Sequence, residues 1–263
     1  MSIASVSSVI KRAFVSPVRT ERDDMMNHHM LRKIDELGVT LERIARRHSP
    51  AALSSSLSPE DMVLTDVILD RGLPIEIFTL DTGRLHAETL ALIDAIEARY
   101  RHRIRVIEPD PSAIARYVAT HGANAFYESI DLRHECCAIR KVEPLKRALT
   151  GKNGWVTGLR EVPGAREALP QTQFDTAHGL VKFNPLAQWT PDDVWTYVRD
   201  RGLPYNRLYD QGYRSIGCAP CTRPTLPHED ERSGRWWWEI GVVRECGLHV
   251  DANGKLTRQK ETA

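Results

Sequence analysis

The stretch that indicates the fold is Pro74-Ile-Glu-Ile-Phe-Thr-Leu80, followed directly by Asp81-Thr82-Gly83-Arg84. The run that ends at Leu80 is rich in β-branched and aromatic residues, which is typical of a strand. Gly83 marks a turn, and the sequence after it has a helical pattern through Tyr100. A strand that passes through a short loop into a helix is the repeating unit of an α/β fold.

Helices and strands alternate on both sides of this unit. Between Asn27 and His48, apolar residues recur every three or four positions, which predicts an amphipathic helix. Ser58 is a natural N-cap, and Pro59 suits the first turn of a second helix. The other predicted elements are a short strand before Ser54–Ser58, a strand at Arg103–Ile107, helical segments within Ser112–Leu149, a strand at Gly154–Thr157 and a helix that starts at Thr190.

These elements predict an α/β fold with a mostly parallel sheet and helices on both faces. Ligands of such sheets bind outside the carboxyl ends of the strands, where this chain has the loops Ser54–Ser58, Asp81–Arg84 and Gly158–Arg166. Regular patterns fade beyond Pro204. We expect a flexible N-terminal tail (1–26), an α/β nucleotide-binding domain (27–203) and an irregular C-terminal extension (204–263) packed on the same domain.

The charge balance argues against several classes of protein. Lys and Arg number 36 and Asp and Glu 35, a net charge of +1, so no overall basic field favours nucleic acid or an anionic membrane. No stretch approaches the roughly 18 uncharged apolar residues of a membrane span. The first twenty residues contain basic side chains and no acids, which faintly resembles a transit peptide, but a flexible tail is the preferred interpretation. We do not expect secretion, because no compact apolar run is followed by a small-residue cleavage site. We expect a cytoplasmic protein whose oligomeric state, a homo-oligomer included, stays open.

Four of the five cysteines form two pairs, Cys136-Cys137 and Cys218-Ala-Pro-Cys221. Four thiolates are the usual ligands of a [4Fe-4S] cluster and also of a structural zinc. Neighbouring side chains on a helix diverge by about 100°, which makes Cys136 and Cys137 awkward partners for one small ion and favours the cluster. Zinc, a redox dithiol and plain buried thiols remain alternatives.

Cys246 is the remaining cysteine, in the segment Arg244-Glu245-Cys246-Gly247-Leu248-His249. A thiolate is the attacking form of cysteine, and cationic neighbours increase its fraction. Arg244 and His249 are such neighbours, whereas Glu245 opposes them. The local sequence therefore allows a reactive thiol or an ordinary exposed one.

Two loops are candidates for binding a nucleotide. The hydroxyls of Ser54, Ser55 and Ser56 and the first amides of the next helix suit a phosphate, although a serine-rich cap and turn explains them as well. The segment lacks the glycines and the Gly-Lys-Ser/Thr end of a Walker loop. The turn Leu80-Asp81-Thr82-Gly83-Arg84 suits a close approach to a nucleotide, with a plain tight turn as the alternative.

Several cations are candidates for meeting an anion. Lys141 follows Cys137 by one helical turn with Arg140 beside it, so one of the two is expected to face a thiolate-bound cluster. Arg232 and Arg235 carry planar donors suited to sulfate or phosphate oxygens. The adjacent Trp236-Trp237-Trp238 is expected to anchor a core or an interface. Gly158-Leu159-Arg160 and Arg166 are similar candidates, and solvated surface charges are the alternative.

Separate motifs follow one another in an order that resembles a known family. They are the serine loop with Pro59-Glu60-Asp61, the Leu80–Arg84 turn with Glu88-Thr89, Cys136-Cys137-Ala138-Ile139-Arg140-Lys141 with Pro144-Leu145, Gly158-Leu159-Arg160, Lys182-Phe183-Asn184-Pro185-Leu186, Ser215–Arg223, Gly234–Glu239 and Glu245–His249. Together they resemble the assimilatory sulfonucleotide reductases, specifically the iron-sulfur form, adenylyl-sulfate (APS) reductase. The resemblance extends from about Leu53 to His249. One departure is Glu161-Val-Pro-Gly-Ala-Arg166, where the family usually has a second arginine and a Gln-Ser pair.

The resemblance implies a fold like that of the adenine-nucleotide α-hydrolases, with Cys246 as the catalytic nucleophile. It also implies a [4Fe-4S] cluster on Cys136, Cys137, Cys218 and Cys221. Among the cations, it implies that Lys141, Arg232 and Arg235 face the substrate. The full set of expected substrate-binding residues is Ser54, Ser55, Ser56, Leu80, Asp81, Thr82, Gly83, Arg84, Lys141, Gly158, Arg160, Arg232, Arg235 and His249.

The function that the resemblance implies is reduction of APS to sulfite and AMP in sulfate assimilation and cysteine biosynthesis. Cys246 would attack sulfur to form an S-sulfocysteine, and a thiol reductant such as thioredoxin would release sulfite. The 3′-phosphorylated relative PAPS stays open as a substrate, and the cluster ligands favour APS by resemblance. Two rival hypotheses are ATP pyrophosphate chemistry on the same fold and a metal-stabilised binding module whose thiols are structural or sensory.

Overall fold

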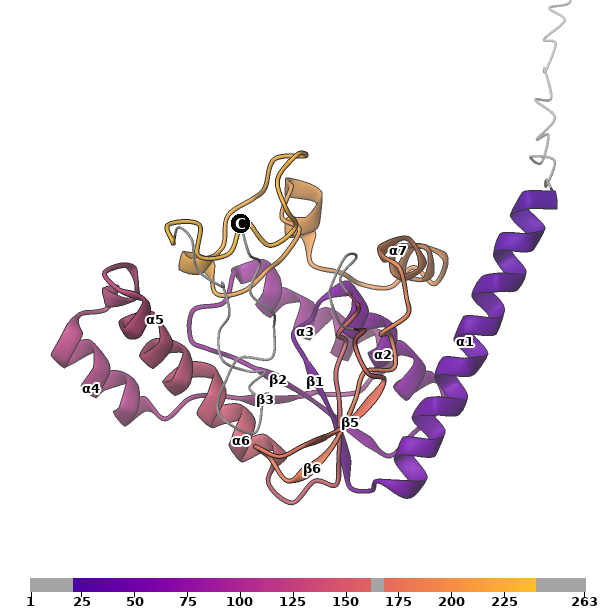
Figure 1. The fold of residues 1–263 in the computed structure, drawn as a ribbon, viewed down its shortest axis with the longest axis horizontal. Coiled ribbons are helices and arrows are strands. Elements are labelled where there is room, and N and C mark those ends of the chain that lie inside the picture. Colours follow the sequence, from indigo (N-terminus) through magenta and orange to yellow (C-terminus); the bar gives the residue numbers. More distant parts are fainter. Residues whose placement is uncertain (1–20, 162–167, 240–263) are drawn as a thin grey trace, which may run out of the picture.

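The computed structural model describes residues 21–161 and 168–239 of the chain (Figure 1). Its centre is a six-stranded sheet of order β3-β2-β1-β4-β6-β5, in which only the β5–β6 pair is antiparallel. This confirms the predicted α/β class and mostly parallel sheet. The strands are β1 (Ala51–Ser55), β2 (Ile75–Leu80), β3 (Arg105–Ile107), β4 (Gly154–Val156), β5 (Thr172–Asp175) and β6 (Leu180–Phe183).

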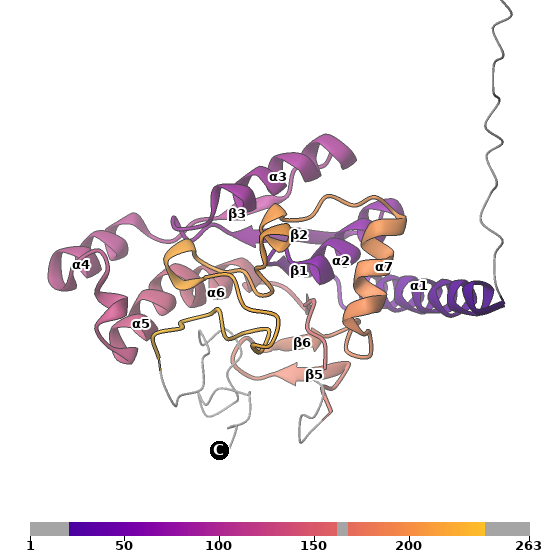
Figure 2. The same ribbon diagram turned by 90° about the horizontal axis from the view of Figure 1, so that it is seen from above.

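Along the chain the helices alternate with the strands as far as β3, and in space helices pack on the sheet (Figure 2). The α-helices in the described part of the chain are α1 (Glu21–Arg47), α2 (Pro59–Asp70), α3 (Ala87–Tyr100), α4 (Pro111–His121), α5 (Ile130–Cys137), α6 (Glu143–Leu149) and α7 (Pro191–Asp200). α1 begins at Glu21, so residues 21–26 are helical and do not belong to the tail predicted for 1–26. No helix in the described ranges is long and apolar enough to span a bilayer.

Two helix starts follow the predicted cap chemistry. The Ser58 hydroxyl accepts a hydrogen bond from the Asp61 amide at the start of α2 (3.3 Å). At the start of α7, Thr190 and Asp193 form a reciprocal capping box. Both caps satisfy amides that have no partner within the helix.

The sheet has one apolar core on each face, because alternate strand residues point to opposite sides. Leu53 and Ile77 face the larger core, which also contains buried side chains of α1, α2, α3 and α7. Ala52 and Phe78 face the smaller core, where α6 supplies Leu145 and further apolar side chains. The prediction that helices cover both faces is therefore confirmed.

The β5–β6 hairpin is the part of the sheet that the sequence pattern does not predict. Phe174 on β5 is 64% exposed, so this edge strand lacks the apolar alternation by which strands are recognised. β6 carries a buried lysine, Lys182, whose Nζ lies 4.6 Å from the centroid of the Trp155 ring. A charged side chain in a strand of only four residues interrupts the apolar pattern from which the strand could be predicted.

A buried aspartate joins three helices on the larger core. Asp66 of α2 is 1% exposed and accepts hydrogen bonds from the hydroxyls of Tyr100 on α3 and Tyr197 on α7, both at 2.7 Å. Arg201 Nε donates to the same carboxylate (3.1 Å). Burial and the contact with Asp66 raise the pKa of both tyrosines above its ordinary value, so they stay protonated donors.

Replacing Asp66 with Asn should lower the free energy of unfolding by about 2 kcal/mol, because hydrogen bonds to a buried charged acceptor contribute about 1.5–3 kcal/mol. Equilibrium urea unfolding at neutral pH measures this change. Asp70→Asn is the matched control, since Asp70 also contacts Arg201 but its side chain is 63% exposed, and its effect should stay below about 0.5 kcal/mol. Equal losses in the two variants would refute the role given to Asp66.

Candidate active site

The loops after β1, β2 and β4 form one edge of the sheet, as parallel pairing requires. β1 pairs in parallel with β2 on one side and with β4 on the other. The loop after β4 packs closely on the start of α2, because a Cβ added to Gly158 would lie 2.3 Å from Asp61 Oδ1. Arg160 Nε donates to Glu60 Oε1 (2.6 Å) and fixes this contact. The structure thus brings Gly158 and Arg160 to the serine loop, as the predicted site requires.

Each of the three serines already has a partner within the protein. Ser56 donates from both its amide (2.6 Å) and its hydroxyl (2.7 Å) to Asp61 Oδ2. The Ser54 hydroxyl accepts from Trp155 Nε1 (2.7 Å), and that of Ser55 accepts from the Leu57 amide (3.2 Å). Since accepting leaves a hydroxyl proton available, Ser54 and Ser55 retain a donor for a ligand, whereas the donors of Ser56 point to Asp61.

Asp61 is a site residue that the sequence pattern predicts only as a helix-start acid. Burial raises the pKa of its carboxyl from 3.8 to about 6, and the hydrogen bonds from Ser56 oppose that rise. Glu60 next to it adds repulsion that raises the pKa further. The buried carboxylate therefore resists ionisation even though it accepts two hydrogen bonds.

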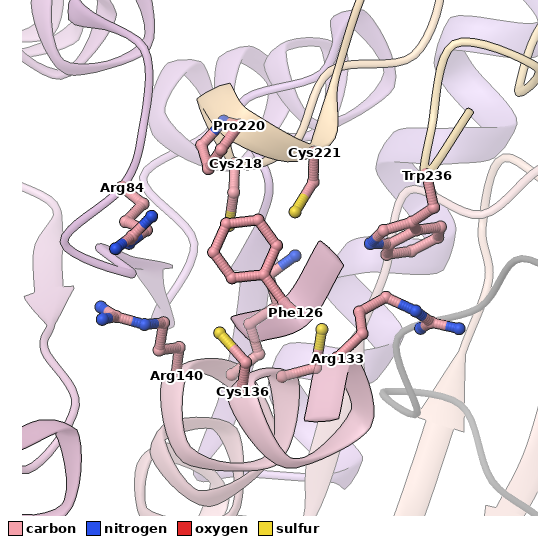
Figure 3. A pocket seen from close by; sticks show the side chains of 11 residues that line it. Arg84, Phe126, Arg133, Cys136, Arg140, Cys218, Pro220, Cys221 and Trp236 are labelled. Atoms are coloured by element: carbon pink, nitrogen blue, oxygen red, sulfur yellow. The ribbon is translucent and has the colours of Figure 1, made fainter. Parts of the chain in front are cut away.

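The four cysteines from the two predicted pairs line one pocket beside these loops (Figure 3). Cys136 and Cys137 lie at the end of α5, where the chain continues into a π-helical turn, η2 (Ala138–Val142). Cys218 directly precedes the short 3-10 helix η4 (Ala219–Cys221), Cys221 is its last residue, and both approach from the other side in Figure 3. None of these four described cysteines forms a disulfide. Tertiary structure thus joins two motifs that are about eighty residues apart.

The β2 loop reaches the same pocket. The Thr82 hydroxyl lies 3.2 Å from Cys218 Sγ, and Arg140 donates to the Thr82 carbonyl (2.6 Å). Gly83 adopts a left-handed conformation with φ of 68°, and its amide donates to Asp81 (2.8 Å). The Leu80–Arg84 turn therefore borders the cysteine pocket, and the strand before it pairs in parallel with the strand before the serine loop.

Cations surround the thiols. The pocket is lined by Arg84, Arg133, Arg140 and Lys141, together with Phe126, Pro220 and Trp236. Burial opposes ionisation of the Cys218 thiol, but Lys141, the Thr82 hydroxyl and Arg235 outweigh it and lower the pKa of Cys218. Burial and the neighbouring Cys218 instead raise the pKa of Cys221 to about 12. The pocket therefore favours the thiolate form of Cys218 more than that of Cys221.

Two observations bear on the predicted metal centre. In residues 21–161 and 168–239, no group of three or more His, Cys, Asp or Glu side chains is arranged to hold a metal ion. Trp236 is fully buried, and its indole N–H has no hydrogen-bond partner among the described residues. That N–H belongs to a ring that lies beside Cys221 in Figure 3. A sulfur-rich anionic group with several points of attachment would suit four separated thiols, four cations and an N–H donor better than one small ion.

The other predicted substrate residues lie in or near the pocket, or outside the described residues. Arg235 is 7% exposed and lies with its guanidinium 4.6 Å from the Trp236 ring centroid. Arg232 is half-buried in the same turn, where its carbonyl accepts from the Arg235 amide (2.9 Å). Arg84 is directed toward Asn124, to which it donates (2.9 Å). Arg166, Cys246 and His249 lie outside the described residues.

Replacing Asp61 with Asn should remove a pH-dependent cost of folding. Because the folded pKa of about 6 exceeds the ordinary 3.8, the wild type loses stability as pH rises through this range, and the loss levels off above it. Between pH 5 and pH 7 the wild type should lose about 1 kcal/mol relative to Asp61→Asn. Urea unfolding of both proteins at each pH measures the difference, and a constant or opposite difference would contradict the raised pKa.

Known proteins share these motifs and this fold. The family model for the phosphoadenosine phosphosulfate reductase domain matches residues 50–224. The adenosine 5'-phosphosulfate reductase of Burkholderia cepacia is 52% identical over 219 residues, which are 83% of this chain and 88% of that protein. That of Allochromatium vinosum is 52% identical over 210 residues, or 80% and 82% of the two chains.

Solved structures share this fold. The phosphate complex of phosphoadenylyl-sulfate (PAPS) reductase from Candida auris has a TM-score of 0.61 and 25% identity, covering 80% of this chain and 100% of that chain. Yeast FAD synthetase, at 16% identity and a TM-score of 0.54 over 81% and 71% of the chains, shows the shared adenine-nucleotide α-hydrolase-like fold alone. This chain therefore belongs to the phosphoadenosine phosphosulfate reductase family, the sulfonucleotide reductases whose motifs its sequence carries.

Proposed function

We propose that this chain reduces adenylyl sulfate to sulfite and AMP, with Cys246 as the nucleophile. The observation that carries the proposal is its 52% identity with an APS reductase over most of both chains. The cation-lined cysteine pocket beside the strand-end loops supports it, because cationic side chains and backbone amides at helix starts bind phosphate and sulfate groups. The reaction belongs to sulfate assimilation and leads to cysteine biosynthesis, which we place in the cytoplasm.

In the first step, the Cys246 thiolate attacks the sulfur of adenylyl sulfate. A bond forms between Cys246 Sγ and that sulfur, and the bond from sulfur to the bridging oxygen breaks. The electron pair of the broken bond stays with the oxygen, so AMP leaves as an anion. Cys246 then carries an S-sulfocysteine.

In the second step, a dithiol protein such as thioredoxin supplies two electrons. One of its thiolates attacks Cys246 Sγ, so that sulfite leaves and a mixed disulfide forms. The second thiolate displaces Cys246 as a thiolate and leaves the reductant oxidised to a disulfide. The two thiol protons of the reductant are released, and the enzyme is ready for the next turnover.

Positive charge is needed because a thiolate attacks a substrate that is itself an anion. Lys141 and Arg235 are 9% and 7% exposed, so solvent screens their charges little. With Arg232 they are positioned to offset the repulsion where negative charge develops, which is stabilisation of the oxyanion-hole type. The serine loop and Gly158 are suited to the nucleotide end, where Ser54 and Ser55 retain donors.

Cys136, Cys137, Cys218 and Cys221 are the proposed ligands of a [4Fe-4S] cluster. When bound, such a cluster would hold the two cysteine segments together and place negative charge next to Lys141. The buried indole N–H of Trp236 supports this assignment, since it needs an acceptor on the pocket side. Lys141 itself influences the pocket directly, because its charge lowers the pKa of Cys218.

Replacing Cys246 with Ser should reduce sulfite production to background while iron content stays unaltered, because the nucleophile is lost but the four ligands remain. An anaerobic sulfite assay with APS and PAPS in turn, together with iron analysis, tests both parts. Cys221→Ser is the comparison variant and should lose iron, since Cys221 lines the pocket. Sulfite production by the Cys246→Ser protein would refute the role of Cys246 as the nucleophile. Release of pyrophosphate from ATP would support the alternative that the chain adenylates a substrate.

Replacing Lys141 with Gln should lower kcat/KM for APS about 100-fold, the usual cost of losing one preorganised donor to a developing charge. Steady-state sulfite formation measures this loss. Lys146→Gln is the control, because Lys146 carries the same charge nearby but is exposed on α6. If both variants lost activity equally, local charge at Lys141 would not explain the rate.

A further inference from the structure

A buried ion pair connects the first cysteine segment to the end of the described chain. On α5, Arg133 donates from Nε to Glu239 Oε1 (2.5 Å) and from its terminal nitrogen to Oε2 (3.0 Å). The two side chains are only 1% and 4% exposed. Because two parallel hydrogen bonds fix direction as well as distance, this contact sets the orientation of Glu239 relative to α5.

The Arg133 end of the pair is built into the cysteine pocket. Arg133 precedes Cys137 by four residues on the same helix, so the two side chains share a face of α5. Its guanidinium also lies 4.7 Å from the centroid of the Trp236 ring, and both residues line the pocket (Figure 3). Any tilt of the guanidinium would therefore disturb the Trp236 contact and the Glu239 contact together.

The Glu239 end of the pair is fixed to the second cysteine segment. The Trp236 amide donates to the Cys221 carbonyl (3.1 Å), and Arg235 forms an isolated antiparallel bridge with Thr222. The Glu239 amide then donates to the Trp236 carbonyl (3.0 Å). Trp236 has a φ of 45°, a left-handed conformation that a non-glycine residue keeps only where its surroundings enforce it.

Glu239 is close to Cys246 along the chain, which connects the ion pair to the proposed nucleophile. Cys246 follows Glu239 by seven residues, and seven residues span at most about 25 Å when fully extended. The Arg133 contact therefore fixes the position of a residue that is close to Cys246 along the chain.

We propose that the Arg133–Glu239 ion pair positions the Cys246 nucleophile by anchoring Glu239, seven residues before it, to α5 at the cysteine pocket. The inference rests on the proposed role of Cys246. Neither Arg133 nor Glu239 touches the reacting atoms in this scheme, so both are positioning residues. A buried ion pair adds little net stability compared with apolar side chains, but it specifies geometry that apolar contacts do not.

Single-turnover reaction with APS, without a reductant, separates positioning from folding. The rate constant for S-sulfocysteine formation on Cys246 reports positioning, whereas the amplitude reports the folded, competent fraction. In Glu239→Gln, which keeps shape but loses the charge, the rate constant should fall roughly 100-fold, as expected for a small misplacement of a reacting group. Amplitude, iron content and AMP affinity should stay within twofold of the wild type.

Glu229→Gln is the matched control. Glu229 forms a two-pronged pair with Arg223 (2.7 and 2.9 Å) in the same C-terminal part of the chain. That pair joins two residues of one loop, and neither of them lines the cysteine pocket. Its loss should leave the rate constant unchanged.

A double variant keeps the test decisive if Glu239→Gln fails to fold. Arg133→Met with Glu239→Met replaces the pair by apolar groups of similar volume, a change that buried pairs often tolerate without loss of stability. It should fold and bind AMP normally, yet its rate constant should fall at least tenfold. Alkylation of Cys246 by iodoacetamide should change by less than twofold, because the thiol itself is unaltered.

The outcomes distinguish the inference from the function on which it rests. A wild-type rate constant in the double variant, or a lower amplitude with an unchanged rate constant, would overturn positioning by the ion pair. An adduct formed by Cys246→Ser protein would instead overturn the proposed function. A slow rate constant in both pair variants, with a normal Glu229→Gln protein, is the result expected.

Discussion

The parallel pairing of β1 with β2 and β4 is the constraint on which the site depends. Because these three strands run in the same direction, the residues that follow their carboxyl ends meet at one edge. The serine loop, the Leu80–Arg84 turn and Gly158 are brought together there. The C-terminal extension then attaches to the same edge, since the Ala219 amide donates to the Arg84 carbonyl (2.8 Å). A different strand direction would separate the cysteine pocket from the loops that suit a nucleotide.

Positive charge is the second feature that organises the site, because buried arginine and lysine side chains line the cysteine pocket. Three arginines of the pocket are held by protein acceptors: Arg133 by Glu239, Arg84 by Asn124 and Arg140 by the Thr82 carbonyl. These contacts fix the guanidinium groups before any ligand arrives, which is the condition for electrostatic preorganisation. The two acidic side chains at the start of α2 are compensated. Burial raises the pKa of the Asp61 carboxyl, and Glu60 is paired with Arg160. Arg84, Arg140 and Lys141 thus gather at the pocket although the whole chain is nearly neutral.

Local patterns predicted most of the fold and part of the site. β2, its loop and the caps at Ser58 and Thr190 follow from neighbouring residues, and the structure confirms them. The β5–β6 hairpin was missed because an exposed Phe174 and a buried Lys182 reverse the usual pattern of such strands. Arg133 was also missed, although its spacing of four residues from Cys137 places both on one helix face. Its partner Glu239 is 106 residues away, and no local signal connects them.

The sequence by itself determined the α/β class, the two cysteine pairs and the family, because each depends on residue types at short spacing. Only the tertiary structure decided that the pairs share a pocket, that Asp61 occupies the donors of Ser56, and that Arg133 meets Glu239. The physical reason is that these contacts join segments whose separation along the chain carries no information about their separation in space. Burial, the pKa of a carboxyl and the partner of a cation arise from that proximity, which folding alone creates.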